Sequence, residues 1–114
     1  MPLLNLCTNI QMTTEQQNGL LERASKHVSN ILGKPESYVM INLTADQTLF
    51  FAGSNKPTAY LELKSLGLPE AKTAEFSRAL CEFINQETDI STDRIYIEFS
   101  SPDRHMWGFD GRTF

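Results

Sequence analysis

The sequence has little of what several protein classes require. It contains two cysteines in 114 residues, Cys7 and Cys81, too far apart for a CxxC pair and too few for a metal cage. We therefore interpret both as reduced thiols that pack as small apolar side chains. No apolar run approaches the roughly 20 residues of a membrane span, and no basic start leads into a signal-peptide core. These absences predict a cytosolic protein without a metal or membrane partner, although secretion without a signal peptide stays open.

Positive charge is also scarce. Lysine and arginine number 10 against 14 aspartate and glutamate residues, which gives a formal net charge of −4. The cations are scattered along the chain and form no basic stripe that could neutralise a phosphate backbone. Nucleic acid is therefore excluded as a partner class, while a small anion can still bind in a local pocket.

Apolar residues at helical spacing predict two helices. The first covers residues 15–32, with Thr13 and Thr14 at its start and Gly33 at its stop. The second covers residues 70–86. We expect His27 on the solvated side of the first helix, where it carries no chemistry.

Period-two alternation predicts four strands. They are LLNLCT (3–8), YVMINL (38–43), AYLELKS (59–65) and RIYIEF (94–99). The order strand-helix-strand therefore occurs twice, and an offset of 57 positions, from Pro2 to Ala59, lays Leu4 on Leu61 and Leu6 on Leu63. The helices do not keep this register in their letters. Two similar but unrelated units stay open as the alternative to a duplication.

The predicted fold class is α+β, a two-layer sandwich in a single domain over residues 1–114. Duplicated β-α-β units form a four-stranded mixed sheet with two helices on one face. One set of alternate strand residues is apolar throughout and can take both helices. The other set mixes tyrosine and methionine with asparagine, glutamate and lysine, which is too apolar for water and too polar for a core. We expect that second face to pack against other copies of the chain.

The crossover geometry brings three parts of the chain to one edge of the sheet. A strand joined to the next through a helix runs parallel to it, so the turn that carries Lys34 returns to the end where the first strand began. In an antiparallel packing of the two halves, Ser65 and Leu66 reach the same edge. Pro2 then lies beside a lysine, and if Met1 is removed its nitrogen becomes a basic secondary amine. The simpler reading is that Pro2 only occupies a free end, where a missing amide hydrogen costs nothing.

Several motifs, in order, carry a family resemblance over essentially the whole chain. They are Pro2 before an apolar strand ending in Thr8-Asn9, LGKP (32–35), Asp46-Gln47, GSNKP (53–57), SLG (65–67), STDRIYIEF (91–99) and the closing WGFDGRTF (107–114). In these features the sequence resembles the macrophage migration inhibitory factor family of the tautomerase superfamily.

The resemblance implies a homotrimer with an active site at each subunit interface and no cofactor. It implies that the processed Pro2 is the catalytic base and that Lys34 and the backbone at Leu66, beside Ser65, bind the substrate. Tyr96 matches an aromatic residue reached from the neighbouring subunit. The family also supports Phe109 and Phe114 as lining residues, although an aromatic tail is as often an oligomer contact.

One site position departs from the resemblance. Glu98 stands where the best-known animal members carry an asparagine that bonds a phenol hydroxyl. An ionised carboxylate there still accepts a hydrogen bond from a hydroxyl group but weakens the binding of a second carboxylate.

The resemblance leaves two functions open. The first is a cofactor-independent keto–enol tautomerase of phenylpyruvate-type 2-oxo acids, with a small aromatic 2-oxo acid or enol as substrate. The second is a cytokine-like binding protein with a vestigial pocket. Met12 lies near the position where the animal factor has an arginine tied to receptor binding, while Asp46 is retained. A receptor partner is therefore not favoured.

Overall fold

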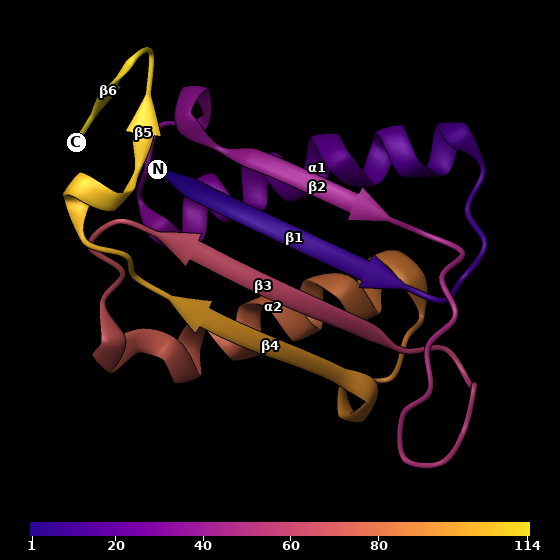
Figure 1. The fold of residues 1–114 in the computed structure, drawn as a ribbon. Coiled ribbons are helices and arrows are strands. Elements are labelled where there is room, and N and C mark those ends of the chain that lie inside the picture. Colours follow the sequence, from indigo (N-terminus) through magenta and orange to yellow (C-terminus); the bar gives the residue numbers. More distant parts are fainter.

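The computed structural model covers residues 1–114 and consists of two layers, a mixed sheet and a pair of helices on one face of it (Figure 1). The helices are α1 (Thr14–Leu32) and α2 (Thr73–Thr88). The strands of the sheet are β1 (Pro2–Thr8), β2 (Met40–Thr44), β3 (Ala59–Ser65) and β4 (Ile95–Ser100). Their order is β2-β1-β3-β4, with β1 parallel to β2, antiparallel to β3, and β3 parallel to β4. The predicted fold class is confirmed.

The ends of α1 lie where the sequence predicts them. The Thr13 hydroxyl accepts a hydrogen bond from the Gln16 backbone N–H at 3.1 Å, and the Gln16 side chain accepts one from the Thr13 N–H at 2.9 Å. This reciprocal pair is a capping box, and it satisfies two backbone donors at the helix start. At the other end Gly33 has φ = 64°, a left-handed conformation that glycine adopts without a Cβ clash.

The second helix begins later than predicted. Residues Glu70–Lys72 form a separate 3-10 turn, and the α-helix follows at Thr73. Likewise β2 starts at Met40, because Glu36–Tyr38 form a 3-10 turn before the strand. Short 3-10 turns are common connectors, and the apolar period that marks an α-helix or strand does not separate them from it.

The two halves of the chain share one plan in space. An offset of 57 residues carries β1 (Pro2–Thr8) onto the bounds of β3 (Ala59–Ser65). The same offset carries α1 onto residues 71–89, within two residues of α2 at both ends. The helices therefore keep the register that their letters do not show. Helix packing tolerates exchange among apolar side chains, so two helices can occupy equivalent positions without similar sequences.

The core lies between the sheet and the helices. Leu4 and Leu6 of β1 and Leu61 and Leu63 of β3 are 2% exposed or less. The buried residues that the helices contribute are Leu20, Ala24, Val28, Phe76, Leu80 and Ile84. Burying an aliphatic side chain of this size stabilises a fold by about 1.5–3 kcal/mol. The period-two and helical patterns therefore meet in one apolar layer, as predicted.

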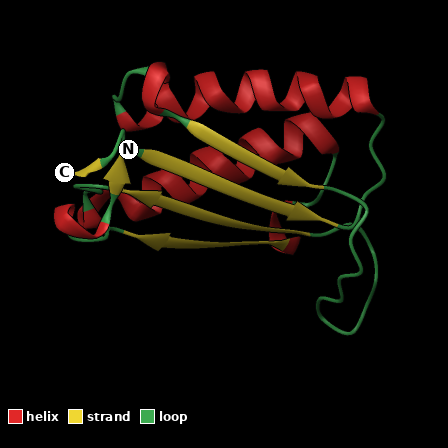
Figure 2. Ribbon diagram, turned by 45° about the horizontal axis from the view of Figure 1, so that its top comes forward, coloured by secondary structure: helices red, strands yellow, loops and turns green.

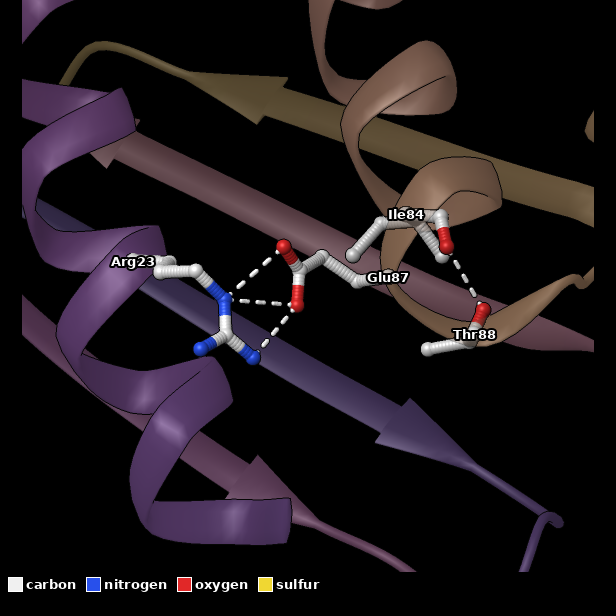
Figure 3. A network of polar contacts seen from close by, with 4 residues as sticks. All are labelled: Arg23, Ile84, Glu87 and Thr88. Atoms are coloured by element: carbon white, nitrogen blue, oxygen red, sulfur yellow. Dashed lines mark hydrogen bonds and ion pairs between the residues drawn. The ribbon is translucent and has the colours of Figure 1, made fainter.

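Polar side chains also join the two helices. The Arg23 guanidinium of α1 forms an ion pair with the Glu87 carboxylate of α2 at 2.7 Å, and its Nε donates to both carboxylate oxygens (Figure 3). In the same view the Thr88 hydroxyl donates to the Ile84 carbonyl of the preceding turn at 2.6 Å. The C-terminal turn of α2 is therefore tied both to its own backbone and to α1.

The prediction that His27 is solvated is wrong. Its ring stacks on Phe83 of α2, with 4.5 Å between the centroids and 14° between the planes, and its Nε2 is buried without a hydrogen-bond partner. Burial lowers the pKa of His27, and a backbone hydrogen bond at Ala79 opposes this only in part. The histidine side chain has both an apolar ring surface and polar nitrogens, so helical spacing alone does not show whether it packs against the neighbouring helix or faces solvent.

The sheet face opposite the helices is uncovered. Its alternate residues form cross-strand rows, among them Asn42, Asn5, Glu62 and Glu98 across all four strands. Large side chains on this face and its margins are exposed: Met40 is 65% exposed, Tyr96 64% and Tyr60 38%. This mixture matches the face that the sequence assigns to contacts with other copies.

The chain ends in a small hairpin that the sequence analysis did not predict. β5 (Gly108–Phe109) pairs with β6 (Arg112–Thr113) through Asp110 and Gly111, whose φ angles are 52° and 76°. Two successive positive φ angles are typical of a tight type I′ turn, for which Asp-Gly is a preferred pair. That dipeptide was the available sequence signal.

Three further features bear on the function classes. No helix is both long and apolar enough to cross a membrane. Both Cys7 and Cys81 are free thiols and half-buried. No three of the histidine, cysteine, aspartate and glutamate side chains gather where they could hold a metal ion.

Candidate functional site

Pro2 is the first residue of a buried strand. It is fully buried at the start of β1, and its register partner on the antiparallel β3 is Ser65. Ser65 is 1% exposed and Leu66, the next residue, 6%. The Ser65 hydroxyl donates to the Leu66 carbonyl at 3.4 Å. The structure therefore brings Pro2, Ser65 and Leu66 to one edge of the sheet, as the crossover argument expects.

A cavity of about 400 Å³ opens at this edge and is mostly apolar in its lining. Its lining residues are Met1, Pro2, Leu3, Ser37, Tyr38, Val39, Met40, Trp107, Gly108 and Phe109. Three separate segments therefore form it: the start of β1, the turn that leads into β2 and the C-terminal hairpin. Figure 1 shows the N-terminus beside β5 at this end of the sheet. A concave, mainly apolar site with few polar groups is typical of small-molecule binding.

The hairpin forms an aromatic wall of the cavity. The Phe109 ring stacks on Phe114 at 5.9 Å between centroids, and Tyr38 meets it edge-on at 6.0 Å. The Phe114 backbone N–H donates to the Trp107 carbonyl at 3.2 Å, which fixes the tail against the hairpin. Phe109 therefore lines the cavity, and Phe114 stacks on its ring without being a lining residue itself. The wall suits a ligand with an aromatic ring.

Two cations lie near the N-terminal amine. The pKa of the Met1 α-amino group is lowered, first by burial, then by the positive charges of Lys34 and Arg104. Lys34 is half-buried behind the Gly33 cap, and its carbonyl accepts a hydrogen bond from the Ser29 hydroxyl at 2.6 Å. The site therefore combines an N-terminal amine of lowered pKa with a positive field that favours an anionic ligand.

Arg104 was missed by the sequence analysis. It lies in the short 3-10 turn Arg104–Met106 between β4 and the hairpin. The spacing of apolar residues predicts strands and helices, but it does not predict the path of an irregular connection between them. The available signal was its place three residues before the closing motif WGFDGRTF (107–114), which carries the two predicted lining residues Phe109 and Phe114.

Tyr96 and Glu98 do not reach this cavity within one chain. Both lie on β4, two strands away from β1, on the uncovered face. A strand rise of about 3.3 Å and a strand spacing of about 4.8 Å put the Tyr96 backbone roughly 19 Å from the Pro2 position and that of Glu98 roughly 14 Å. Glu98 instead accepts a hydrogen bond from the Tyr60 hydroxyl at 3.0 Å, which, ahead of burial, raises the pKa of Tyr60.

A second cavity, of about 380 Å³, lies at the far end of the helices. Its lining is mainly polar and includes the Arg23–Glu87 ion pair together with Gln16 and Asp89. It contains no amine, thiol or histidine that could act as a base or nucleophile. The cavity beside Pro2 is therefore the better candidate for chemistry.

The duplicated β-α-β fold with a proline at the start of β1 defines a protein of the tautomerase-superfamily class. The sequence model described as "Macrophage migration inhibitory factor (MIF)" matches residues 1–114. A macrophage migration inhibitory factor homolog of Trichinella spiralis is 36% identical over 115 residues, with 100% of each chain covered. The mouse factor is 30% identical, with 100% of this chain and 99% of the relative covered.

Solved structures agree with the sequence comparisons. The crystal structure of a macrophage migration inhibitory factor homologue from Prochlorococcus marinus has a TM-score of 0.91 and 38% identity, with 98% of each chain covered. The chain belongs to the macrophage migration inhibitory factor family. Membership supports a tautomerase-type isomerase activity in general.

Proposed function

We propose that the protein is a cofactor-independent keto–enol tautomerase of phenylpyruvate-type 2-oxo acids, with Pro2 as its base once Met1 is removed. The observation that carries the proposal is the place of Pro2. It is buried at an apolar cavity, next to the Met1 amine, whose pKa is lowered by burial and then by the charges of Lys34 and Arg104. Once Met1 is removed, the free nitrogen of Pro2 occupies these surroundings. A neutral amine at neutral pH is what a general base requires.

The proposed reaction moves one proton. The Pro2 nitrogen lone pair takes a proton from C3 of the 2-oxo acid, the C3–H electron pair forms the C2–C3 double bond, and the C2 carbonyl oxygen takes up the negative charge. The ammonium of Pro2 then returns the proton to that oxygen, which gives the enol. In the reverse direction the Pro2 nitrogen takes the hydroxyl proton of the enol and delivers it to C3, while the C2 carbonyl re-forms. Atoms and electrons balance without a co-reactant.

Each remaining group has a proposed part in this step. Lys34, with Arg104 near it, holds the substrate carboxylate and stabilises the negative charge that develops on the C2 oxygen. The Leu66 backbone beside Ser65 contacts the enol region. The wall of Phe109 and Phe114 takes the aromatic ring, and the pyrrolidine ring of Pro2 fixes the direction of its lone pair.

A homotrimer completes the proposed site. The uncovered sheet face supports it, because Met40, Tyr60 and Tyr96 would otherwise stay in water. It also accounts for the roughly 19 Å between Tyr96 and Pro2 in one chain, since Tyr96 and Glu98 of a neighbouring subunit can then reach the pocket. Light scattering should give three times the 12.9 kDa chain mass. A monomer at micromolar concentration would contradict the trimer.

Ketonisation of phenylpyruvate enol tests the enzymatic proposal. Protein whose intact mass shows a free Pro2 should accelerate the loss of enol absorbance, and 3-phenylpropionate, which has the ring and carboxylate but no ketone, should compete. A verified trimer with free Pro2 that binds this competitor but gives no acceleration would favour the vestigial pocket of a binding protein instead. The cytosol is the proposed location, and detection in washed-cell extract against medium tests it.

A further inference from the structure

The segment between β2 and β3 projects from the end of the sheet opposite the Pro2 cavity (Figures 1 and 2). Within it Phe51 and Ser54 pair as a minimal hairpin, with backbone hydrogen bonds of 2.9 and 3.1 Å. The two residues between them, Ala52 and Gly53, have φ angles of 52° and 72°. The positive φ of Ala52 is unfavourable for a residue with a Cβ, so contacts from outside the turn must hold this conformation.

Arg94 supplies those contacts from the short 3-10 turn Thr92–Arg94 that leads into β4. Its Nε donates to the Pro57 carbonyl at 2.9 Å, and its two terminal nitrogens donate to the carbonyls of Phe51 at 3.1 Å, Ser54 at 3.2 Å and Lys56 at 3.0 Å. One guanidinium therefore satisfies four backbone acceptors. A lysine ammonium cannot reproduce this planar fork.

The same guanidinium orients an aromatic pair. Its central carbon lies 5.2 Å from the centroid of the Phe51 ring, within cation–π range. The Phe51 ring in turn meets Tyr96 edge-on, with 4.8 Å between centroids and 87° between planes. Tyr96 is otherwise 64% exposed, so Phe51 is its main aromatic support in the chain. The contacts form a line from Arg94 through Phe51 to Tyr96.

We infer that Arg94 is a positioning residue for the substrate pocket, because it fixes Phe51 and thereby the Tyr96 ring that a subunit presents to its neighbour. The inference rests on the function proposed above. Arg94 touches no reacting atom and acts on ligand binding alone. The base Pro2 and its cations lie at the opposite end of the sheet, and the side-chain hydrogen bonds of Arg94 are all to the segment between β2 and β3.

The test is Arg94→Lys, which keeps the positive charge and loses most of the hydrogen bonds of the guanidinium. We expect KM for phenylpyruvate enol to rise about three- to tenfold, the range that an oriented aromatic pair contributes, with kcat within about twofold of wild type. Trp107 is the only tryptophan and lines the cavity, so its fluorescence reports the Kd of 3-phenylpropionate, which should rise in parallel. Phe51→Leu removes the intermediate ring and should give a similar rise.

Two comparisons keep the inference falsifiable. The double variant should raise KM no more than the larger single effect, because both changes act on one line of contacts. Arg78→Lys, at an exposed arginine of α2 with no side-chain hydrogen bond or ion pair, is the matched control and should match wild type. Three results would each overturn the inference: KM and Kd within twofold of wild type in Arg94→Lys, additive effects in the double variant, or a rise in KM that is accompanied by dissociation of the trimer.

The proposed function and the inference fail differently. A wild-type protein that binds 3-phenylpropionate without catalysing ketonisation contradicts the tautomerase proposal. The Trp107 titration of the Arg94 and Phe51 variants still decides whether Arg94 positions the pocket.

Discussion

Replacement of Lys34 by alanine should weaken the binding of carboxylate ligands much more than that of their methyl esters. An ionised hydrogen-bonding partner is worth about 1.5–3 kcal/mol, and the half-buried place of Lys34 favours the lower part of that range because water screens the rest. The Kd of 3-phenylpropionate, measured by Trp107 fluorescence, should therefore rise about 10- to 30-fold. For the methyl ester the change should stay within about twofold, since an ester carries no charge.

The same substitution should alter the N-terminal amine. Burial first, and then the charge of Lys34, lowers the pKa of the Met1 amine. We expect a free Pro2 nitrogen next to that position to feel the same charge, so the loss of Lys34 should raise the pKa seen on the acid side of the kcat/KM profile. The amine then becomes neutral only at higher pH, and activity at low pH falls. Lys26→Ala, at an exposed lysine of α1, is the control and should change neither quantity. Equal losses for acid and ester would refute the role of Lys34.

Three further predictions concern the fold and its two helices. Burial lowers the pKa of His27, so between the two pKa values the unfolded chain binds a proton that the folded chain does not. The free energy of unfolding should therefore be highest above the ordinary histidine pKa of about 6.5 and fall as the pH drops below it. His27→Phe, which keeps a ring on Phe83, should flatten this fall in denaturant titrations, and an unchanged pH slope would contradict it. Leu80→Ala, at a side chain that is 0% exposed, should lower the free energy of unfolding by about 2–5 kcal/mol. A loss below 1 kcal/mol would contradict this and show that neighbouring side chains move in to fill the cavity. Arg23→Gln breaks an exposed ion pair, so Tm should fall slightly at low salt and the difference should vanish at high salt; a loss that salt does not change would mean that the pair works by packing.

Regular elements were the predictable part of the fold. The alternation in AYLELKS predicts a strand at Ala59–Ser65, and β3 has those bounds. Thr13 and Gly33 predict the limits of α1, because caps and left-handed glycines are local chemistry that does not depend on the rest of the chain. The meeting of Pro2 with Ser65 also follows from the sequence, since crossover handedness and strand direction leave few arrangements.

The unpredicted part depends on contacts between irregular segments. Arg94 belongs to the strand motif RIYIEF, but nothing in that pattern shows that its side chain turns back to four carbonyls of another loop. Arg104 and the stacking of His27 on Phe83 are similar cases. Long amphipathic side chains reach several neighbours from one backbone position, so the side that they choose is set by tertiary packing.

The site could be predicted as residues but not as a complete pocket. Pro2 and Phe109 line one cavity, Lys34 lies near the N-terminal amine, and the sequence together with the family resemblance had proposed all three as site residues. Tyr96 and Glu98 lie elsewhere on the same chain, because the feature that brings them to the cavity is the association of subunits that we propose.

The most direct test of the account is the chemistry of the Pro2 nitrogen. One added residue before Pro2, or retention of Met1, turns that nitrogen into an amide without a basic lone pair and leaves every other side chain in place. Intact mass and light scattering should first verify the extension and the trimer, with Pro2→Gly as a second variant that keeps a free but poorly oriented amine. The account predicts that the extended trimer loses nearly all ketonisation of phenylpyruvate enol and that Pro2→Gly retains a reduced rate. Full activity in the verified extended trimer would contradict it.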